Sequence, residues 1–232
     1  MTSWDEAYAS RYEEWSAHMT ADIPFYVELA LQANGPLVEL AVGNGRVAVP
    51  IAQATGRQVI GIDTSPLMLK QAQANAERAG VDLDLRLGDM RDVAFDEPAA
   101  LIYCPFRALL HLPTWRDRRR TFERVAAALQ PGGRFAWNAI AFDHHIAARL
   151  DGTHQDEPVP YSLRYLVGDN RIDITLDHNG ETSSLWWATK NEWLGLIDVA
   201  GLEIEAFYGG FEHEPFTADS HEYAFVVRRN DD

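Results

Sequence analysis

The sequence predicts an α/β protein built on a mostly parallel β-sheet, and three observations support this fold class. Short apolar runs alternate with segments of helical character between residues 35 and 142. A glycine-rich turn, Gly43-Asn44-Gly45, follows the first of these runs. Between residues 158 and 188 the pattern changes to short strands separated by turns, and the alternation then resumes. Strands separated by helices form βαβ units, which pair in parallel with right-handed crossovers.

The first part of the chain supplies most of the predicted parallel sheet. Apolar runs predict strands at Leu37–Ala41, Gln58–Ile62, Leu83–Leu87, Ala99–Cys104 and Arg134–Phe142. Helices are predicted at Val47–Ala54, from Pro66 through Ala79, and from the capping residue Thr114 to Leu129. Proline is tolerated at a helix start because the missing N–H has no partner there. Gly80 and Pro131-Gly132-Gly133 end two of the helices.

The second part predicts an antiparallel insertion and the end of the sheet. Turn signals separate predicted strands at Ser162–Val167, Arg171–Leu176 and Glu181–Trp187. A helix at Lys190–Ala200 and strands at Glu203–Tyr208 and Tyr223–Arg228 follow. The expected architecture is therefore a seven-stranded, mostly parallel sheet with helices on both faces. A small antiparallel β insertion follows its fifth strand.

Composition limits the classes of partner. The chain of 232 residues is 47% hydrophobic, as expected for a single globular domain. Its formal net charge of -15 disfavours nucleic acid and membranes as partners, because an acidic surface repels phosphate groups. We interpret the short basic run from Arg116 to Arg120 as a solvated helix face.

The same composition bears on location. Cys104 is the sole cysteine, which excludes an internal disulfide and fits a reducing compartment. No apolar run reaches the roughly 18 residues that a membrane-spanning helix needs, and residues 1–15 lack the apolar core of a signal peptide. We expect a cytoplasmic protein.

The residues that follow the predicted strands indicate a nucleoside-like cofactor. Ligands bind beyond the carboxyl ends of the strands in such sheets, and the turn from Ala41 to Gly45 lets the backbone approach a ligand closely. Glu39 lies in an apolar strand, where a carboxylate needs a partner such as an amine-bearing ligand. Asp63 can accept hydrogen bonds from both hydroxyls of a ribose. Asp89 and the backbone of Met90 can bind an adenine.

With these motifs, the sequence resembles the class I S-adenosylmethionine-dependent methyltransferases, which have a Rossmann-like fold, over nearly the whole chain. Glu39-x-Ala41-x-Gly43-x-Gly45-Arg46 is similar to the family's first motif, and Asp63 is similar to its second-strand acid. Gly88-Asp89-Met90 resembles its adenine-contacting motif, and Leu129-Gln130-Pro131-Gly132-Gly133 resembles the turn before its fifth strand. Ala41 and Asn44 depart from the family pattern, which usually has glycine and threonine or serine there.

The resemblance implies methyl transfer from S-adenosylmethionine to a nitrogen or oxygen atom of a small molecule, with S-adenosylhomocysteine as the product. It places Glu39 and the turn by the methionine moiety, Asp63 by the ribose, and Asp89 and Met90 by the adenine. The expected cofactor-binding residues are Glu39, Ala41, Gly43, Asn44, Gly45, Arg46, Asp63, Thr64, Met68, Asp89, Met90, Cys104, Pro105 and Phe106.

The resemblance also implies a domain organisation. Residues 1–232 form a single methyltransferase domain, in which residues 1–34 are an N-terminal helical cap and residues 35–142 are the cofactor-binding core. Residues 158–188 are the insertion, which serves as an acceptor lid or as the interface of a homodimer, and residues 189–232 complete the sheet.

The acceptor site has weaker signals. The end of the fourth strand carries only Pro105-Phe106 of the Asn/Asp-Pro-Pro-Tyr/Phe motif that is typical of nucleic-acid and protein-glutamine amino-methyltransferases, which argues against those groups. His111 is a candidate general base, because imidazole titrates near neutrality, and a packed core histidine is the alternative. Tyr12 is a second catalytic candidate. It lies four residues after Tyr8, so both share a face of a predicted N-terminal helix. The candidate substrate-binding residues are Tyr8, Arg107, His144, Tyr161 and Arg164.

Other functions remain open at this point. His144 and His145 have no third ligand at a suitable spacing, so no metal is expected. A nicotinamide-dependent oxidoreductase is one alternative, although Ala41 and Arg46 occupy the outer glycine positions of the dinucleotide fingerprint. A non-catalytic S-adenosylmethionine-binding protein is the other.

Overall fold

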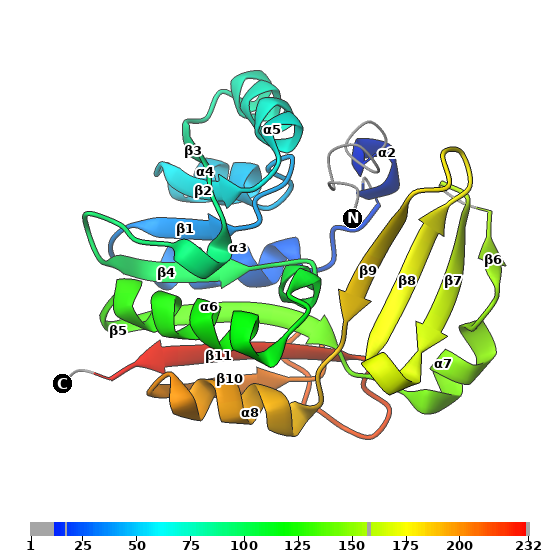
Figure 1. Ribbon diagram of the computed structural model, residues 1–232. Helices are drawn as coiled ribbons and strands as arrows, with labels where there is room; N and C mark the ends of the chain where they lie inside the picture. The colour runs from blue at the N-terminus through cyan, green and yellow to red at the C-terminus, as the bar shows by residue number, and fades with distance from the viewer. Residues whose placement is uncertain (1–11, 17, 157–158, 231–232) are drawn as a thin grey trace.

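The structure is a computed structural model that describes residues 12–16, 18–156 and 159–230. Its main sheet has seven strands in the order β10-β11-β5-β4-β1-β2-β3 (Figure 1). Six of these strands run in the same direction and β11 runs opposite to them, as the pairings show. The strands are β1 (Leu37–Leu40), β2 (Val59–Asp63), β3 (Leu83–Leu87), β4 (Ala99–Cys104), β5 (Leu129–Ile140), β10 (Leu202–Tyr208) and β11 (Glu222–Arg229). The predicted fold class is confirmed.

Helices cover both faces of this sheet. On one face lie α3 (Ile23–Gln32), α4 (Ala48–Thr55) and α5 (Pro66–Ala79), and on the other lie α6 (Trp115–Ala128) and α8 (Lys190–Val199). A short helix, α2 (Tyr12–Ser16), precedes them. The predicted cap Thr114 is confirmed, since its side chain accepts a hydrogen bond from the Asp117 amide, and at the start of α5 Ser65 Oγ accepts one from the Met68 amide at 2.9 Å.

An aromatic cluster forms the core between the sheet and the α6–α8 layer. The rings of Phe135 and Trp137 stack at 4.9 Å between centroids, and Trp137 stacks on Phe225 at 4.9 Å. Phe122 of α6 and Trp193 of α8 pack onto this cluster. Residues two apart on a strand share a face, so the alternation in β5 places both of its aromatic rings on the same layer.

A second, four-stranded sheet follows the fifth strand of the main sheet, as predicted. It consists of β6 (His154–Gln155), β7 (Tyr161–Leu166), β8 (Arg171–Leu176) and β9 (Thr182–Trp186), all antiparallel. Figure 1 shows the parallel strands pointing toward this sheet, which stands beyond their carboxyl ends. Phe142 and Trp187 stack face to face at 4.0 Å where the two sheets meet.

Some local features differ from the prediction. The sequence analysis missed α7 (His144–Leu150), in which the Asp143 carboxylate accepts a hydrogen bond from the His145 amide at 2.7 Å, and the two-residue strand β6. The strand β5 begins at Leu129, so Pro131-Gly132-Gly133 lie within it. A Cβ at Gly133 would lie 2.8 Å from the Ala99 carbonyl oxygen, so this close approach requires glycine. Three 3-10 helices also occur among the described residues: η1 (Met90–Asp92), η2 (Ala108–His111) and η3 (Val167–Asp169).

The interpretation of the basic run is wrong for one residue. Arg116, Arg119 and Arg120 are exposed, but Arg118 is buried. The Arg118 guanidinium donates to the Trp186 carbonyl oxygen and lies 5.4 Å from the centre of the Trp193 ring. Helical geometry alone does not reveal this contact, because the Trp186 carbonyl oxygen lies 68 residues away in the sequence.

Within the described part of the chain, no helix is both long enough and apolar enough to cross a membrane.

Candidate functional site

A cavity of about 480 Å³ lies between the carboxyl ends of the parallel strands and the second sheet. We call its two parts the core half and the outer half. The core half is lined by Tyr12, Met19, Ala41, Gly43, Asp63, Thr64, Met90, Pro105 and Phe106. The outer half is lined by Arg107, Ala108, His111, Ile140, Leu150, Tyr161, Leu163, Tyr165, Ile172, Ile174, Ser183 and Leu185. One cavity thus joins the predicted cofactor residues to the insertion.

The glycine-rich turn forms one wall of the core half. Ala41, Gly43 and Gly45 all have positive φ angles, of 55°, 55° and 81°. The Gly43 amide donates to Asp63 Oδ2 at 2.8 Å, and the Ser65 amide donates to Asp63 Oδ1 at 2.9 Å. Asp63 also lines the cavity, where a carboxylate can accept hydrogen bonds from ligand hydroxyls.

Glu39 lies beneath this turn and is 2% exposed. Burial raises the pKa of its carboxyl well above the usual range, although Tyr103 and Arg46 oppose the shift. Neither Glu39 Oε2 nor the Tyr103 hydroxyl makes a hydrogen bond of normal geometry with the described residues. A buried carboxylate oxygen without a donor is costly, and the ammonium group of a ligand is a suitable partner.

The N-terminal segment closes the core half from the side. Arg46 forms a bidentate salt bridge with Asp22, with Nη1–Oδ1 at 2.6 Å and Nη2–Oδ2 at 2.7 Å. The Arg46 guanidinium also lies 4.8 Å from the centre of the Phe106 ring. The buried side chain of Tyr12 packs on Met68 and meets the Phe106 ring edge-on at 6.3 Å. Tyr8, the other tyrosine predicted to close over the cofactor, lies outside the described residues.

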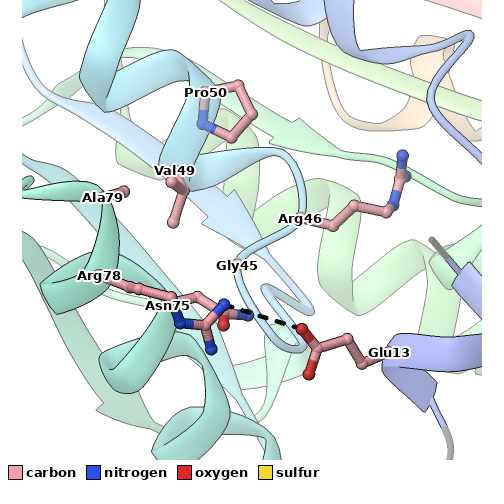
Figure 2. Close-up of a pocket in the computed structure, with 8 residues that line it drawn as sticks. All are labelled: Glu13, Gly45, Arg46, Val49, Pro50, Asn75, Arg78 and Ala79. Atoms are coloured by element: carbon pink, nitrogen blue, oxygen red, sulfur yellow. Dashed lines mark ion pairs between the residues drawn. The ribbon is translucent and has the colours of Figure 1, made fainter.

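The other side of the turn faces a separate, open hollow of about 400 Å³ (Figure 2). Gly45 and Arg46 line it, but Figure 2 shows the Arg46 side chain extending away from Asn75 and Arg78. Asn75 Nδ2 donates to the Asn44 carbonyl oxygen at 2.9 Å, which ties the turn to α5. Asn44 and Gly45 therefore lie on the side of the turn that faces α5.

Asp89 and Met90 follow β3 as predicted, and they face different partners. Met90 lines the cavity. The Asp89 carboxylate accepts from the Arg91 amide at 2.9 Å and from the Arg91 guanidinium, with Nη2–Oδ2 at 2.5 Å. This pairing lowers the pKa of Asp89, so the carboxylate is ionised. The Asp89 carboxylate therefore pairs with Arg91 in this structure.

The loop after β4 is strained where it meets the cavity. Phe106 and Arg107 have φ angles of 57° and 61°, which is uncommon for residues other than glycine. Cys104 is buried just before them at the end of β4, and burial raises the pKa of its thiol. Backbone strain of this kind persists only where the surrounding structure holds it in place.

A polar network that sequence analysis missed holds this loop. Arg107 binds Glu222 with Nη2–Oε2 at 2.5 Å and Nε–Oε2 at 3.0 Å. Asn138 Nδ2 donates to Glu222 Oε1 at 2.6 Å, and the Tyr26 hydroxyl donates to Asn138 Oδ1 at 3.0 Å. The sequence signal that could have found this network is Asn138, a polar side chain in an apolar strand, and a signal of the same kind singled out Glu39.

His111 ends η2 and presents its exposed surface in the outer half of the cavity. The surrounding protein lowers the pKa of the imidazole to about 4, and a hydrogen bond to the Ser184 backbone partly opposes this. The hydrogen bond stabilises the charged form, so a ring N–H donates to the Ser184 carbonyl oxygen. The imidazole is therefore neutral at pH 7.

The structure separates the predicted substrate residues. Tyr161 and Arg107 line the outer half. Arg164 is an exposed residue whose Nε lies 3.5 Å from Asp151 Oδ1, and His144 is exposed on α7 with its ring 3.9 Å from that of His145. Tyr165, which is not among the predicted substrate residues, also lines the cavity. The part of the chain that the structure describes contains no group of three or more His, Cys, Asp or Glu side chains suited to a metal ion.

This donor set fits S-adenosylmethionine. Asp63 places a carboxylate at the cavity, Glu39 has an oxygen without a donor beneath the turn, and Tyr12, Phe106 and Met90 supply apolar surface. A ribose, an amino group and a flat base require these three kinds of contact.

Comparisons with known proteins agree. Residues 37–133 match the sequence profile of a family described as a methyltransferase domain. The putative methyltransferase YqeM of Bacillus subtilis (strain 168) is 30% identical over 183 residues, which cover 74% of this chain and 70% of that protein. The dTDP-3-amino-3,6-dideoxy-alpha-D-glucopyranose N,N-dimethyltransferase of Streptomyces fradiae is 26% identical over 207 residues, covering 82% of this chain and 78% of that one.

A solved structure shows the same fold. The S-adenosylmethionine-dependent methyltransferase from Clostridium acetobutylicum ATCC 824 superimposes with a TM-score of 0.81 at 13% identity, covering 96% of this chain and 98% of that one. The sequence matches identify a methyltransferase, which sets aside the nicotinamide alternative, and the solved structure has the same fold. The chain belongs to the family of S-adenosylmethionine-dependent methyltransferases.

Proposed function

We propose that the protein transfers the methyl group of S-adenosylmethionine to a small organic acceptor that binds in the outer half of the cavity. One observation carries this proposal: a single cavity connects the glycine-rich turn and Asp63 to the inner face of the second sheet. Its volume of about 480 Å³ lies in the range of roughly 300–1,000 Å³ that is typical of small-molecule sites.

The core half would hold the cofactor. Asp63 would accept hydrogen bonds from the ribose hydroxyls, and Glu39 would pair with the amino group of the methionine moiety. Met90 would contact the adenine, with Asp89 sharing its carboxylate between the base and Arg91. Pro105 and Phe106 would border the methyl group, since they line the cavity where β4 ends.

The chemistry of the step places modest demands on the protein. When bound, S-adenosylmethionine supplies a methyl group on a positively charged sulfur, which is a good leaving group. The protein's side chains align the acceptor and exclude water, and alignment of this kind is worth roughly 7–11 kcal/mol. Tyr12 and Phe106 cover the core half, and Ile174 and Leu185 give the outer half an apolar wall.

The relatives support a small acceptor. The Streptomyces fradiae protein acts, by its name, on a nucleotide-linked amino sugar. The absence of the Asn/Asp-Pro-Pro motif before Phe106 and the net charge of -15 both argue against nucleic acid.

The test is the formation of S-adenosylhomocysteine from S-adenosylmethionine, measured by mass spectrometry with small phenols and amines, with tRNA and with ribosomal protein. We expect turnover with a small molecule. Leu163→Trp fills the outer half and should abolish turnover while S-adenosylhomocysteine binding is retained. Arg164→Ala, on the opposite face of β7, is the control and should leave turnover unchanged. Methylation of tRNA or protein with none of any small molecule would refute the proposal.

A further inference from the structure

The inner face of the second sheet is built from alternate residues of three strands. On β7 the residues that line the cavity are Tyr161, Leu163 and Tyr165, which lie two positions apart and so share a face. The strand register places Leu163 opposite Ile174 of β8, and Ile174 opposite Ser183 of β9. The outer half of the cavity therefore presents aromatic rings and hydrocarbon surface, which suit a ligand with an apolar ring system.

One permanent charge lies at this surface. Arg107 is the only side chain charged at pH 7 among the described residues that line the outer half. The titratable side chains beside it are neutral, because the surrounding protein lowers the pKa of His111 to about 4 and burial raises the pKa of Tyr161 and Tyr165. The charge that a ligand meets in the outer half therefore depends on Arg107 and its partner.

That partner, Glu222, matches the charge of Arg107 from within the protein. Arg107 donates to Glu222 Oε2 from Nη2 at 2.5 Å and from Nε at 3.0 Å, and Asn138 Nδ2 donates to Oε1 at 2.6 Å. Glu222 is only 8% exposed and is not among the described residues that line the cavity. A ligand thus meets the guanidinium, whose charge is already balanced, and does not meet the carboxylate.

Arg107 can still donate hydrogen bonds on its cavity side. Its side chain is 46% exposed, and Nη1 donates to none of the described residues. A carbonyl, amide or hydroxyl oxygen of a neutral ligand can accept from this group. A carboxylate or phosphate would lose its hydration beside a guanidinium that Glu222 has already neutralised, and an ammonium group would face a cation, so both are unfavourable.

Resting on the proposed function, we propose that the acceptor is an uncharged molecule with an apolar ring system, and that Glu222 is the residue that gives the site its preference for neutral ligands. Glu222 acts through Arg107 and is therefore a positioning residue. Loss of the Glu222 charge leaves Arg107 as an anion-binding group. Loss of the Arg107 charge leaves Glu222 to favour a cation.

The binding test uses the protein saturated with S-adenosylhomocysteine, so that no turnover occurs. Calorimetry at pH 7.5 compares three ligands of similar outline: 2-naphthamide (neutral), 2-naphthoate (an anion) and 2-naphthylmethylamine (a cation). We expect 2-naphthamide to bind at least about 10-fold more tightly than either ion, because burial of an unmatched charge is unfavourable. A smaller preference, or no binding of 2-naphthamide, would overturn the proposal.

Glu222→Gln tests the role of the carboxylate. The affinity for 2-naphthoate relative to 2-naphthamide should rise at least about 10-fold, because hydrogen bonds to a charged group contribute roughly 1.5–3 kcal/mol. Glu222→Asp keeps the charge and should keep the wild-type ratio. Glu203→Gln is the matched control, since Glu203 is an exposed acid that pairs with Arg228 at 3.1 Å. An unchanged ratio in Glu222→Gln would refute the assignment of Glu222.

Arg107→Gln tests the same pair with the opposite sign, and it serves equally if Glu222→Gln does not fold. The affinity for 2-naphthylmethylamine relative to 2-naphthamide should rise at least about 10-fold. Each ratio comes from one protein preparation, so a smaller folded fraction affects both ligands alike. A ratio that stays at the wild-type value in folded Arg107→Gln would contradict the proposal.

Leu163→Trp locates the ligand. This change fills the outer half, so it should remove 2-naphthamide binding while S-adenosylhomocysteine binding is retained. Unchanged 2-naphthamide affinity would place the ligand elsewhere and overturn the proposal. If S-adenosylhomocysteine binds and small molecules are methylated, but 2-naphthoate or 2-naphthylmethylamine is preferred, the proposed function stands and this inference fails. If S-adenosylhomocysteine does not bind, the proposed function itself fails.

Discussion

At the residue scale, Ala41 and Glu39 at the glycine-rich turn each raise the free energy of the folded protein. Ala41 has a φ of 55°, where a Cβ is unfavourable by roughly 1–2 kcal/mol. Glu39 is a buried carboxyl with one oxygen that no described residue satisfies. Costs of this kind are expected where a structure is shaped to bind a ligand, and each can be measured separately.

Ala41→Gly should stabilise the protein. Glycine relieves the strain at positive φ, and the gain exceeds the added entropy of the unfolded chain, so we expect about 0.5–1 kcal/mol of extra stability in urea unfolding. Ala74→Gly is the control, because Ala74 is exposed within α5 and glycine there should cost about 1 kcal/mol. If the free energy of unfolding changed in the same direction in both variants, the backbone strain at Ala41 would be contradicted.

Glu39→Gln should change how stability depends on pH. Burial raises the folded pKa of Glu39 above its unfolded value. Protonated Glu39 is therefore compatible with the fold at low pH, and stability is lost as pH rises above the ordinary carboxyl range. Without bound cofactor, the variant should match the wild type near pH 5 and exceed it by about 1 kcal/mol or more at pH 8.

The contribution of Glu39 to binding should have the opposite sign. Glu39→Gln should weaken S-adenosylhomocysteine binding, because the amide cannot offer a charge to the ligand's amino group. Glu97→Gln, an exposed position, is the control for both measurements. If the stability difference between Glu39→Gln and the wild type stayed constant between pH 5 and pH 8, the pKa of Glu39 would not be raised in the folded protein.

Single residues also mark the limit of sequence-based prediction. Asp63 was predictable because the acid, its strand and its turn lie close together in the sequence. The pairing of Asp89 with Arg91 was not predicted, although the two residues are only two positions apart. Several local groups compete as partners for a loop carboxylate. The Tyr26–Asn138–Glu222–Arg107 network joins residues that are 31 to 115 positions apart, and only the sheet order brings them together.

At the element scale, α6 anchors the second sheet to the main one. Arg118 donates to the carbonyl oxygen of Trp186, at the end of β9, while its guanidinium covers Trp193 of α8. The stacked pair Phe142–Trp187 adds a second attachment. The position of the apolar wall of the cavity therefore depends on contacts that lie outside the cavity.

Arg118→Ala should destabilise the protein by about 2–4 kcal/mol. The change leaves the Trp186 carbonyl oxygen without its donor, at a cost of roughly 1–3 kcal/mol, and removes the packing of the side chain stem. Arg119→Ala, the exposed neighbour that pairs with Glu123, should stay within about 0.5–1 kcal/mol of the wild type. Equal effects in thermal unfolding would show that the Arg118 contact has no structural role.

The elements themselves were largely predictable. Periodicity, caps and turn residues located the strands and helices to within a few positions, because these signals are local. Among the elements that were not predicted, α7 and β6 have clear physical reasons. The helix α7 is only seven residues long, and β6 is a two-residue strand that exists through its pairing with β7.

At the scale of the whole molecule, the alternation of strands and helices predicted the sheet with its insertion. The cavity could not be predicted, since its outer half is lined mainly by residues of β7, β8 and β9 and its core half mainly by residues that follow β1, β2, β3 and β4. In the proposed function, the parallel sheet would present the glycine-rich turn to the cofactor, and the antiparallel sheet, which stands beyond the carboxyl ends of the parallel strands (Figure 1), would present a surface to the acceptor.

The central claim is that the cofactor binds at the glycine-rich turn with its ribose on Asp63. The most direct test is the binding of S-adenosylhomocysteine to the wild type, to Asp63→Ala and to Asp84→Ala, whose carboxylate pairs with Arg86 away from the cavity. At about 100 times its Kd, the ligand should stabilise the wild type by roughly 2.7 kcal/mol, which is about 5–11 °C in Tm.

Asp84→Ala should behave like the wild type in this measurement. Asp63→Ala should lose about 10-fold or more in affinity by calorimetry, because hydrogen bonds to a charged group contribute roughly 1.5–3 kcal/mol. Undiminished affinity in a folded Asp63→Ala variant would contradict the placement of the cofactor.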